Sequence, residues 1–484
     1  MPRPPLRPSP HRPTRALAAL LALLPAAALA QAAAPGPAPD ADPVLAELVS
    51  QSLTARPELR QAEATVRAQR ERVPQVGALP DPVLTLGIQN DGFNGLQIGK
   101  AETSWYQVML TQGLPWPGKR GLRTDVARLG ADQAGAALER VRLTTEADVR
   151  RAYLDLLLSR DRLVLLKRLA GIWETSAGLA RARYESGDAP QSDVLRAQLE
   201  LNRIRQRAFA LSAQEAAATQ SLNRLRVRPV DEPIATTATV RTLSLAEPAP
   251  AQAVLDDALA RSPELAQARL ATMQADRSAD LARRERYPDL AVQAGIMPRG
   301  ELVPMWTLGV SIGLPVWSSR KQGRAVAESE ARAQAGARGQ EALEQLLRLR
   351  VAERRTAQLA LLDTVKLYRE GLLVQSRATA ESTLSQYKVG RVTFASVLEA
   401  NAGYIADEDS FLSAVADAQR LAIATDEVSL ETTGGPAAAP MGGGGIPGAG
   451  ATGGGGRAPS GAAAGGGGQE AAPAASGGGM GGGM

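Results

Sequence analysis

The residue types that most often carry chemistry are nearly absent from this chain. It contains no cysteine and a single histidine, His11, which lies in a segment that we expect to be removed. Without thiolate or imidazole groups, the remaining chain lacks ligands for a zinc or copper(II) site. It also lacks groups for cysteine-based nucleophilic catalysis or histidine-based acid–base catalysis, and it has no phosphate-binding glycine motif. The sequence therefore predicts a protein that is not an enzyme and that carries no cofactor.

Two methionines are the remaining candidates for contact with a metal. Met297 and Met305 flank a short connection between two predicted strands. Their thioethers could contact copper(I), but a flexible methionine side chain more commonly fills gaps in packing. We favour packing, and we expect that replacing both residues with leucine leaves the function of the chain unchanged.

The first 30 residues have the pattern of an export signal. Four arginines between Arg3 and Arg15 surround or precede an apolar stretch at 16–24, which is too short to span a membrane as a helix. Ala-Leu-Ala at 28–30 is typical of a cleavage site, so we expect Gln31 to be the first mature residue, without a cysteine for a lipid anchor. The alternative is a short anchor helix. Removal of the signal leaves 51 basic against 50 acidic residues, a net charge of about +1, which does not favour nucleic-acid binding.

The elements that position any site come from a tandem duplication. The sequence RYESG at 183–187 returns about 203 residues later as QYKVG at 386–390, and GLPW at 113–116 returns as GLPVW at 313–317. A period of this length excludes the short solenoid repeats. We therefore expect two similar halves that share one structure.

Proline placement predicts very long helices in both halves. No proline lies between Pro117 and Pro190 or between Pro315 and Pro436, and a proline inside a helix costs about 3 kcal/mol. A helix from about Lys119 to Tyr184 would be on the order of 100 Å long at 1.5 Å per residue. An ordinary globular domain does not need a helix of that length.

Apolar residues at alternating steps of three and four give these helices a seam. The steps run through 149–184, 194–225 and 397–421, and they are less regular just before Tyr387. Sustained steps of this kind indicate left-handed coiled-coil packing. We therefore predict that the chain reverses at 187–190 and at 390–393, so that each long helix packs against an antiparallel partner. We call these two turns the tips.

Two strand-like segments precede the long helix of each half, at about 83–90 and 104–114 and again at about 289–298 and 305–314. From Trp306 to Leu314 every second residue is apolar and the residues between are small or polar. Such alternation over about nine residues matches a tilted membrane strand, although a half-buried sheet of a soluble protein would alternate as well. Four strands cannot close a barrel by themselves, so a membrane sheet would need strands from several chains, and three chains would supply twelve.

These patterns predict a mainly α protein with a small membrane β-barrel and long antiparallel coiled-coil helices in a duplicated unit. The predicted parts are a signal peptide (1–30), an N-terminal linker (31–42), a first repeat (43–230) with a helical hairpin at about 119–228, a linker (231–250), a second repeat (251–432) with a hairpin at about 319–430, and a Gly/Ala-rich tail (433–484). The tail cannot bury a core, so we expect it to be disordered.

Together these features resemble the TolC family of outer-membrane efflux proteins, over residues 43–432. The resemblance rests on the twofold repeat, the Tyr-x-x-Gly tips followed by Val-Leu at 194–195 and 397–398, and the Gly-Leu-Pro junctions. The junction at 112–120 resembles the branch that serves heavy-metal pumps of the CzcC and CusC type. The resemblance implies a homotrimer, with a twelve-stranded barrel in the outer membrane and a helical tunnel through the periplasm. It also implies two partners, a periplasmic adaptor and an inner-membrane pump of the RND type.

The resemblance further implies that the hairpin tips dock the adaptor. The tip residues are Tyr184, Gly187, Asp193, Val194 and Leu195 in the first half and Tyr387, Gly390, Thr393, Val397 and Leu398 in the second. The alternative is that they only cap the helices or pack the seam.

Three charged residues near the tips are candidates for a gate. In the TolC family acidic residues near the position of Glu399 face the tunnel, which implies a ring of three carboxylates that favours cations. Ser396 stands where relatives can carry a second acid. Asp193 and Arg391 lie on neighbouring tips and could form an ion pair that keeps the mouth shut. The alternative is that all three are solvated surface charges, since an exposed pair contributes only about 0–1 kcal/mol.

Two functions fit the sequence. The first is a passive export duct for metal cations or drugs, driven by a partner because the chain has no nucleotide or redox site. The second is a soluble periplasmic coiled-coil adaptor, which would also need an export signal and a long hairpin. The amphipathic strand pairs and the duplication favour the duct.

Overall fold

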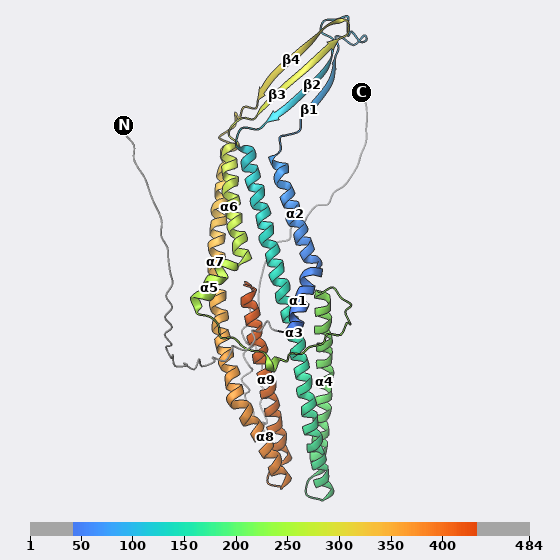
Figure 1. Cartoon of the computed structure of the whole chain (residues 1–484), viewed down its shortest axis with the longest axis vertical. Helices are drawn as coiled ribbons and strands as arrows, with labels where there is room; N and C mark the ends of the chain where they lie inside the picture. Colours follow the sequence, from blue (N-terminus) through green and yellow to red (C-terminus); the bar gives the residue numbers. More distant parts are fainter. Residues whose placement is uncertain (1–41, 433–484) are drawn as a thin grey trace, which may run out of the picture. The chain divides into compact units, whose positions relative to one another are not determined.

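A computed structural model describes residues 42–432 of the chain (Figure 1). The predicted signal peptide, nearly all of the N-terminal linker and the Gly/Ala-rich tail lie outside the described residues. The first repeat contains α1 (Pro43–Ala55), α2 (Pro57–Gly77), β1 (Val83–Gln89), β2 (Trp105–Leu114), α3 (Lys119–Glu185) and α4 (Gln191–Leu225). The second contains α5 (Ala251–Arg261), α6 (Pro263–Arg284), β3 (Leu290–Arg299), β4 (Leu302–Ile312), α7 (Gln322–Leu367), the π-helical turn η3 (Tyr368–Leu372), α8 (Leu373–Lys388) and α9 (Phe394–Asp426). A short 3₁₀ turn, η2 (Val240–Thr242), lies between them. The mainly α fold with a four-stranded antiparallel sheet confirms the predicted class.

Each repeat opens with two helices that the predicted hairpins do not include. The second helix of each pair, α2 or α6, begins with a proline at its first turn, Pro57 or Pro263. Proline is well suited to this position because its fixed φ angle is helical and its missing N–H would be unpaired there anyway. In the second repeat the Ser262 hydroxyl also accepts a hydrogen bond from the Leu265 amide at 3.2 Å.

The four strands form one antiparallel sheet in the order β1-β2-β3-β4. The two repeats join where β2 pairs with β3, for example at Val108 opposite Ile296. Strand β4 begins at Leu302 rather than near 305, so the connection to β3 is only two residues long. Met297 and Met305 therefore do not flank that connection; they face each other across the β3–β4 ladder.

Helix α3 is 67 residues long and packs against α4 in an antiparallel hairpin (Figure 1). In the second repeat the corresponding hairpin is α7, η3 and α8 against α9 (Figure 1). The π-helical turn explains the irregular seam before Tyr387. The buried positions Leu361 and Val365 follow one series of three- and four-residue steps, and this series would continue to 386. Because a π turn holds one extra residue, the buried position becomes Tyr387.

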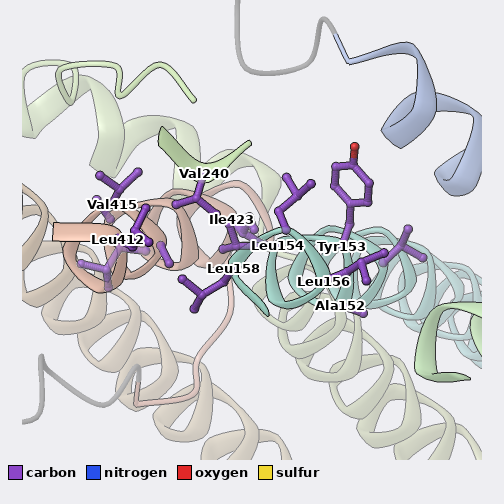
Figure 2. Close-up of a cluster of buried hydrophobic side chains, with 14 of the residues drawn as sticks. Ala152, Tyr153, Leu154, Leu156, Leu158, Val240, Leu412, Val415 and Ile423 are labelled. Atoms are coloured by element: carbon purple, nitrogen blue, oxygen red, sulfur yellow. The ribbon is translucent and has the colours of Figure 1, made fainter. Parts of the chain in front are cut away.

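The largest hydrophobic core joins the two repeats through α3, α9 and η2 (Figure 2). Leu156, Val240 and Val415 are completely buried in it. Each such side chain contributes roughly 1.5–3 kcal/mol by leaving water. Ion pairs border the core, including one between Arg162 and Asp409 at 2.7 Å. This core fixes the first hairpin to the second within one chain. Among residues 42–432, every helix is too short or too polar to cross a membrane.

Candidate functional site

One face of the sheet is apolar and exposed. Its side chains alternate along every strand, and at least a third of the surface of each is exposed: Leu84, Leu86, Ile88, Tyr106, Val108, Leu110, Ile296, Trp306, Leu308, Val310 and Ile312. Among the described residues no helix covers this face. Monomeric soluble proteins rarely expose a continuous apolar surface of this kind, so the surface indicates contact with lipid or with another protein.

The opposite face of the sheet is polar or small. Thr85, Gln107, Thr111, Gln293 and Thr307 occupy the positions between the apolar ones, as the register requires. Large apolar side chains also occur on this face, mostly toward the strand ends: Val83, Trp105, Met109, Met297, Val303 and Met305. Within residues 42–432, strands β1 and β4 each have one edge without a strand partner. Unpaired edges of this length are a liability unless another strand covers them.

Hydrogen bonds, an ion pair and a ring stack join the two repeats where the sheet meets the helices. The Lys119 amine, at the start of α3, donates to the Asp289 carboxylate and to the Tyr287 carbonyl oxygen, both at 2.8 Å. Lys119 is only 3% exposed, so its charge depends on these partners. The Trp116 amide donates to the same carboxylate at 2.8 Å, and the Trp116 ring stacks on Tyr287 with centroids 5.5 Å apart. We call this set of four residues the repeat junction. The sequence predicted the strand-to-helix break here but not this contact.

An aromatic cluster joins the tips of the two hairpins. Phe394, at the start of α9, packs edge-on against Trp173 of α3 at 6.2 Å and against Tyr387 of α8 at 5.4 Å. All three rings are almost completely buried. Val397 of the predicted tip set is buried in the same cluster, and Val194 and Leu398 are partly buried against it.

Arg183 is a tip residue that the sequence did not single out for a role. Its guanidinium lies 4.8 Å from the centre of the Tyr387 ring and donates to the Tyr387 carbonyl oxygen at 2.8 Å. It also donates to the carbonyl oxygen of Asp188 in its own hairpin at 3.2 Å. Arg183 thus links both tips. The repeat does not mark Arg183 as a functional residue, because the corresponding residue of the second repeat is Gln386.

Both tips reverse with the same backbone pattern. The Asp188 amide donates to the Arg183 carbonyl oxygen at 2.8 Å, and the Arg391 amide donates to the Gln386 carbonyl oxygen at 2.9 Å. Gly187 and Gly390 have φ angles of 80° and 75°, a region that favours glycine. These glycines are therefore required by the turn itself.

The other predicted tip residues differ in exposure. Tyr184 and Leu195 are 46% and 56% exposed and have no cluster to pack against. Thr393 is exposed at the N-cap of α9, where its hydroxyl lies 3.2 Å from that of Ser396. Exposed apolar side chains at a tip are suited to contact with another molecule.

The structure brings Asp193 close to Tyr387 rather than to Arg391. Burial raises the pKa of the Tyr387 hydroxyl, and the negative charge of Asp193 raises it further while Arg183 opposes this effect. The hydroxyl has no well-oriented hydrogen-bond partner among the described residues. Arg391 is exposed, and within the single chain no ion pair joins it to Asp193. A pair between neighbouring chains stays a prediction.

Glu399 borders a groove between α4 and α9. The groove has a volume of about 1100 Å³, and its floor is formed by α3 residues that include Leu169 and Trp173. Four arginines and three carboxylates line it: Arg162, Arg196, Arg203, Arg207, Glu200, Glu399 and Asp409. The charge around Glu399 is therefore mixed, and the cation preference predicted from this residue stays a prediction.

A duplicated pair of helical hairpins that leads into a sheet with one exposed apolar face defines an outer-membrane channel fold. The model of the outer membrane efflux protein family matches residues 48–226 and 254–425. The chain belongs to this family. No curated protein sequence matches it.

Solved structures with the same fold include three channels of low sequence identity. The chain is similar to the outer-membrane channel OprN, with a TM-score of 0.69 and 18% identity over 80% of this chain and 90% of that one. It is similar to CusC, with a TM-score of 0.69 and 18% identity over 81% and 91%. It is also similar to the open state of MtrE from Neisseria gonorrhoeae, with a TM-score of 0.68 and 19% identity over 80% and 89%.

Proposed function

We propose that the chain is the outer-membrane channel subunit of a tripartite efflux system. Three copies form one barrel of twelve strands, and their helical hairpins form a tunnel through the periplasm. The observation that supports this most directly is the sheet, which exposes an apolar face and leaves both edges unpaired. Lipid suits such a face, and strands from further copies suit such edges, because a membrane sheet must close on itself.

In this proposal two partner proteins act with the channel. A periplasmic adaptor docks on the tips, where Tyr184 and Leu195 are exposed, and an inner-membrane pump of the RND type provides the energy. The chain is exported to the outer membrane by a cleaved signal peptide at 1–30. The substrate class, metal cations or drugs, is selected by the pump.

The same tips supply the gate. Glu399 borders the groove between α4 and α9, and in this proposal three copies of that groove meet around the tunnel axis. Asp193 and Arg391 of neighbouring copies hold the mouth shut until the adaptor separates them.

The second candidate, a soluble periplasmic adaptor, conflicts with the exposed sheet. A soluble protein would have to keep eleven apolar side chains of that face in water. Burial of such side chains is worth roughly 25 cal/mol per Å², so the chain would aggregate or bind a membrane.

The proposal is tested by fractionation and by conductance. The protein should be extracted from the outer membrane only with detergent, should have the mass of a trimer in mild detergent, and should form pores in planar bilayers. A chain that appears in the soluble periplasmic fraction, or that remains a monomer in mild detergent, contradicts the proposal.

A further inference from the structure

Strands β1 and β2 of the first repeat pair in the same register as β3 and β4 of the second. Ile88 lies opposite Tyr106 in the β1–β2 ladder, and Ile296 lies opposite Trp306 in the β3–β4 ladder. These are corresponding pairs, because Gly-Ile at 87–88 matches Gly-Ile at 295–296 and Gly-Leu-Pro at 113–115 matches Gly-Leu-Pro at 313–315. The correspondence between repeats therefore holds residue by residue through the sheet.

The contact between the repeats, in contrast, occurs only once in a single chain. It places Val108 opposite Ile296, Leu110 opposite Ala294 and Gln112 opposite Val292. By the same correspondence β4 is the counterpart of β2 and β1 is the counterpart of β3. The outer edges of β4 and β1 could therefore pair as β2 and β3 do. Replacing each residue by its counterpart gives the expected pairs: Leu308 with Ile88, Val310 with Leu86, and Ile312 with Leu84. All six side chains lie on the exposed apolar face, whereas a slip of one residue would place apolar side chains opposite the polar face.

The segments beside these edges are matching halves of the repeat junction. Asp81, in the Pro-Asp before β1, corresponds to Asp289, and Leu79 corresponds to Tyr287. After β4, Trp317 and Lys321 follow Gly-Leu-Pro in the same order as Trp116 and Lys119 do in the first repeat, in a segment that is two residues longer.

These counterparts are exposed in the single chain. Leu79 is 44% and Trp317 67% exposed. Asp81 and Lys321 are exposed too, and neither forms an ion pair within residues 42–432. One junction is therefore complete and the other is left open with complementary groups, an acid at one edge and a base at the other.

We propose that a second copy of this chain completes the open junction. Strand β4 pairs with β1 of the partner subunit in the register given above, Lys321 bonds to Asp81 of the partner subunit, and Trp317 covers Leu79 of the partner subunit. This inference rests on the proposed trimer and adds the residues that join its subunits. Complete and newly completed junctions then alternate around the barrel, six in all for three chains.

Cysteine cross-linking tests the register, since the native chain has no cysteine. We expect the double variant Leu86→Cys with Val310→Cys to yield covalent dimers and trimers on non-reducing denaturing gels after mild oxidation. Directly opposite residues have Cβ atoms about 4.5–5.5 Å apart, close to the spacing of a disulfide. Within one chain the two positions lie on opposite edges of the sheet, about 14 Å apart at roughly 4.8 Å per strand, so any bond formed joins two chains.

The matched control is Ile88→Cys with Val310→Cys, which lies one step along the diagonal at about 7–8 Å. It should yield much less covalent product. Equal or greater cross-linking of this control, or no cross-linking of the first pair in a protein that still forms trimers, overturns the proposed register and leaves the trimer in place. A native protein that is monomeric in mild detergent overturns both the trimer and this inference.

Charge reversal tests the ionic contact separately. Asp81→Lys and Lys321→Asp should each lower the temperature at which the detergent-solubilised trimer dissociates, and the two changes in one chain should restore most of it. The control is Arg338→Glu with Glu341→Arg, an exposed pair within α7, which should leave that temperature unchanged. Single variants that dissociate like the parent, or a double variant no better than the singles, overturn the contact between Asp81 and Lys321.

Discussion

The tips of the two hairpins carry the same motif but have different surroundings. Tyr387 of the second tip is 2% exposed and lies between Arg183, Trp173 and Phe394, whereas Tyr184 of the first tip is 46% exposed. The counterparts of those three neighbours in the other repeat are Gln386, Ser376 and Gln191. The contact made inside one chain is therefore aromatic, and the corresponding contact with another copy would be polar. The two hairpins of one chain are therefore joined by buried rings around Tyr387, whereas Tyr184 of the first tip stays exposed in the single chain.

This difference is tested most directly by replacing Tyr387 and Tyr184 one at a time. Tyr387→Ala should destabilise the tips by about 3–5 kcal/mol, as deletion of a buried aromatic ring does. Tyr184→Ala should change their stability by less than about 0.5 kcal/mol, as exposed substitutions do. Hydrogen–deuterium exchange of the tip amides measures both effects. Equal protection in the two variants would show that the aromatic cluster does not hold the tips together.

Replacing the tip glycines gives the next largest effect. A side chain at Gly187 or Gly390 must adopt a positive φ angle, at a cost of roughly 1–2 kcal/mol. At Gly390 the new Cβ would also lie 3.3 Å from Arg183 Nη2, whereas the space around Gly187 is open. Valine at both positions should abolish efflux and leave the trimer intact, and Gly390→Val alone should be more harmful than Gly187→Val.

The control for this series is Gly178→Ala, at a helical position of α3 with open space around it. Drug or metal resistance of cells that depend on this channel provides the measurement, with trimer content followed in parallel. Full resistance in the double valine variant would contradict a docking role for the tips.

The charges near the tips should have a smaller effect. Asp193→Ala with Arg391→Ala should raise the conductance of the channel in planar bilayers, and Glu399→Ala should reduce its preference for cations. Asp193 is buried but Arg391 is exposed, and water screens a pair that includes an exposed charge. If the pair contributes about 1 kcal/mol, the change in open probability should be about fivefold. If both variants conduct like the parent, the gate lies elsewhere on these helices.

The smallest effect concerns one hydroxyl group. The pKa of Tyr387 is raised by burial and by Asp193, so the folded tip holds a proton that the unfolded chain releases near pH 10. Stability should therefore fall as the pH rises above about 10. In Tyr387→Phe this fall should be smaller, and the remainder should come from Tyr153 and Tyr404, whose pKa values are also raised by burial. The variant should resemble the parent at pH 7 because the hydroxyl has no well-oriented partner to lose. Trp173 fluorescence against pH reports the transition; a fall as large in the phenylalanine variant as in the parent would assign it to those other groups.

Local periodicity made much of the fold predictable. The strands show an alternation of two and the hairpins a seam of three and four, and both patterns depend only on nearby residues. The surroundings of the tips could not be predicted in this way. Tyr184 and Tyr387 both occupy a Tyr-x-x-Gly motif, and Tyr387 differs because it packs against Phe394 and against Trp173, which lies in the other repeat. For the same reason the sequence suggested Arg391 as the partner of Asp193, whereas the folded chain brings Tyr387 close.

The π-helical turn at Tyr368–Leu372 changes the direction in which the later side chains of the second hairpin point. A helix turns by about 100° for each residue, and a π turn holds one extra residue. Compared with an unbroken α-helix of the same sequence, every later side chain therefore points about 100° away. In that unbroken helix Gln386 would point where Tyr387 now points, and the ring that the first hairpin binds would face away. The π turn, roughly 25 Å along the helix axis from the tip at 1.5 Å per residue, thus decides which of two adjacent side chains meets the neighbouring hairpin.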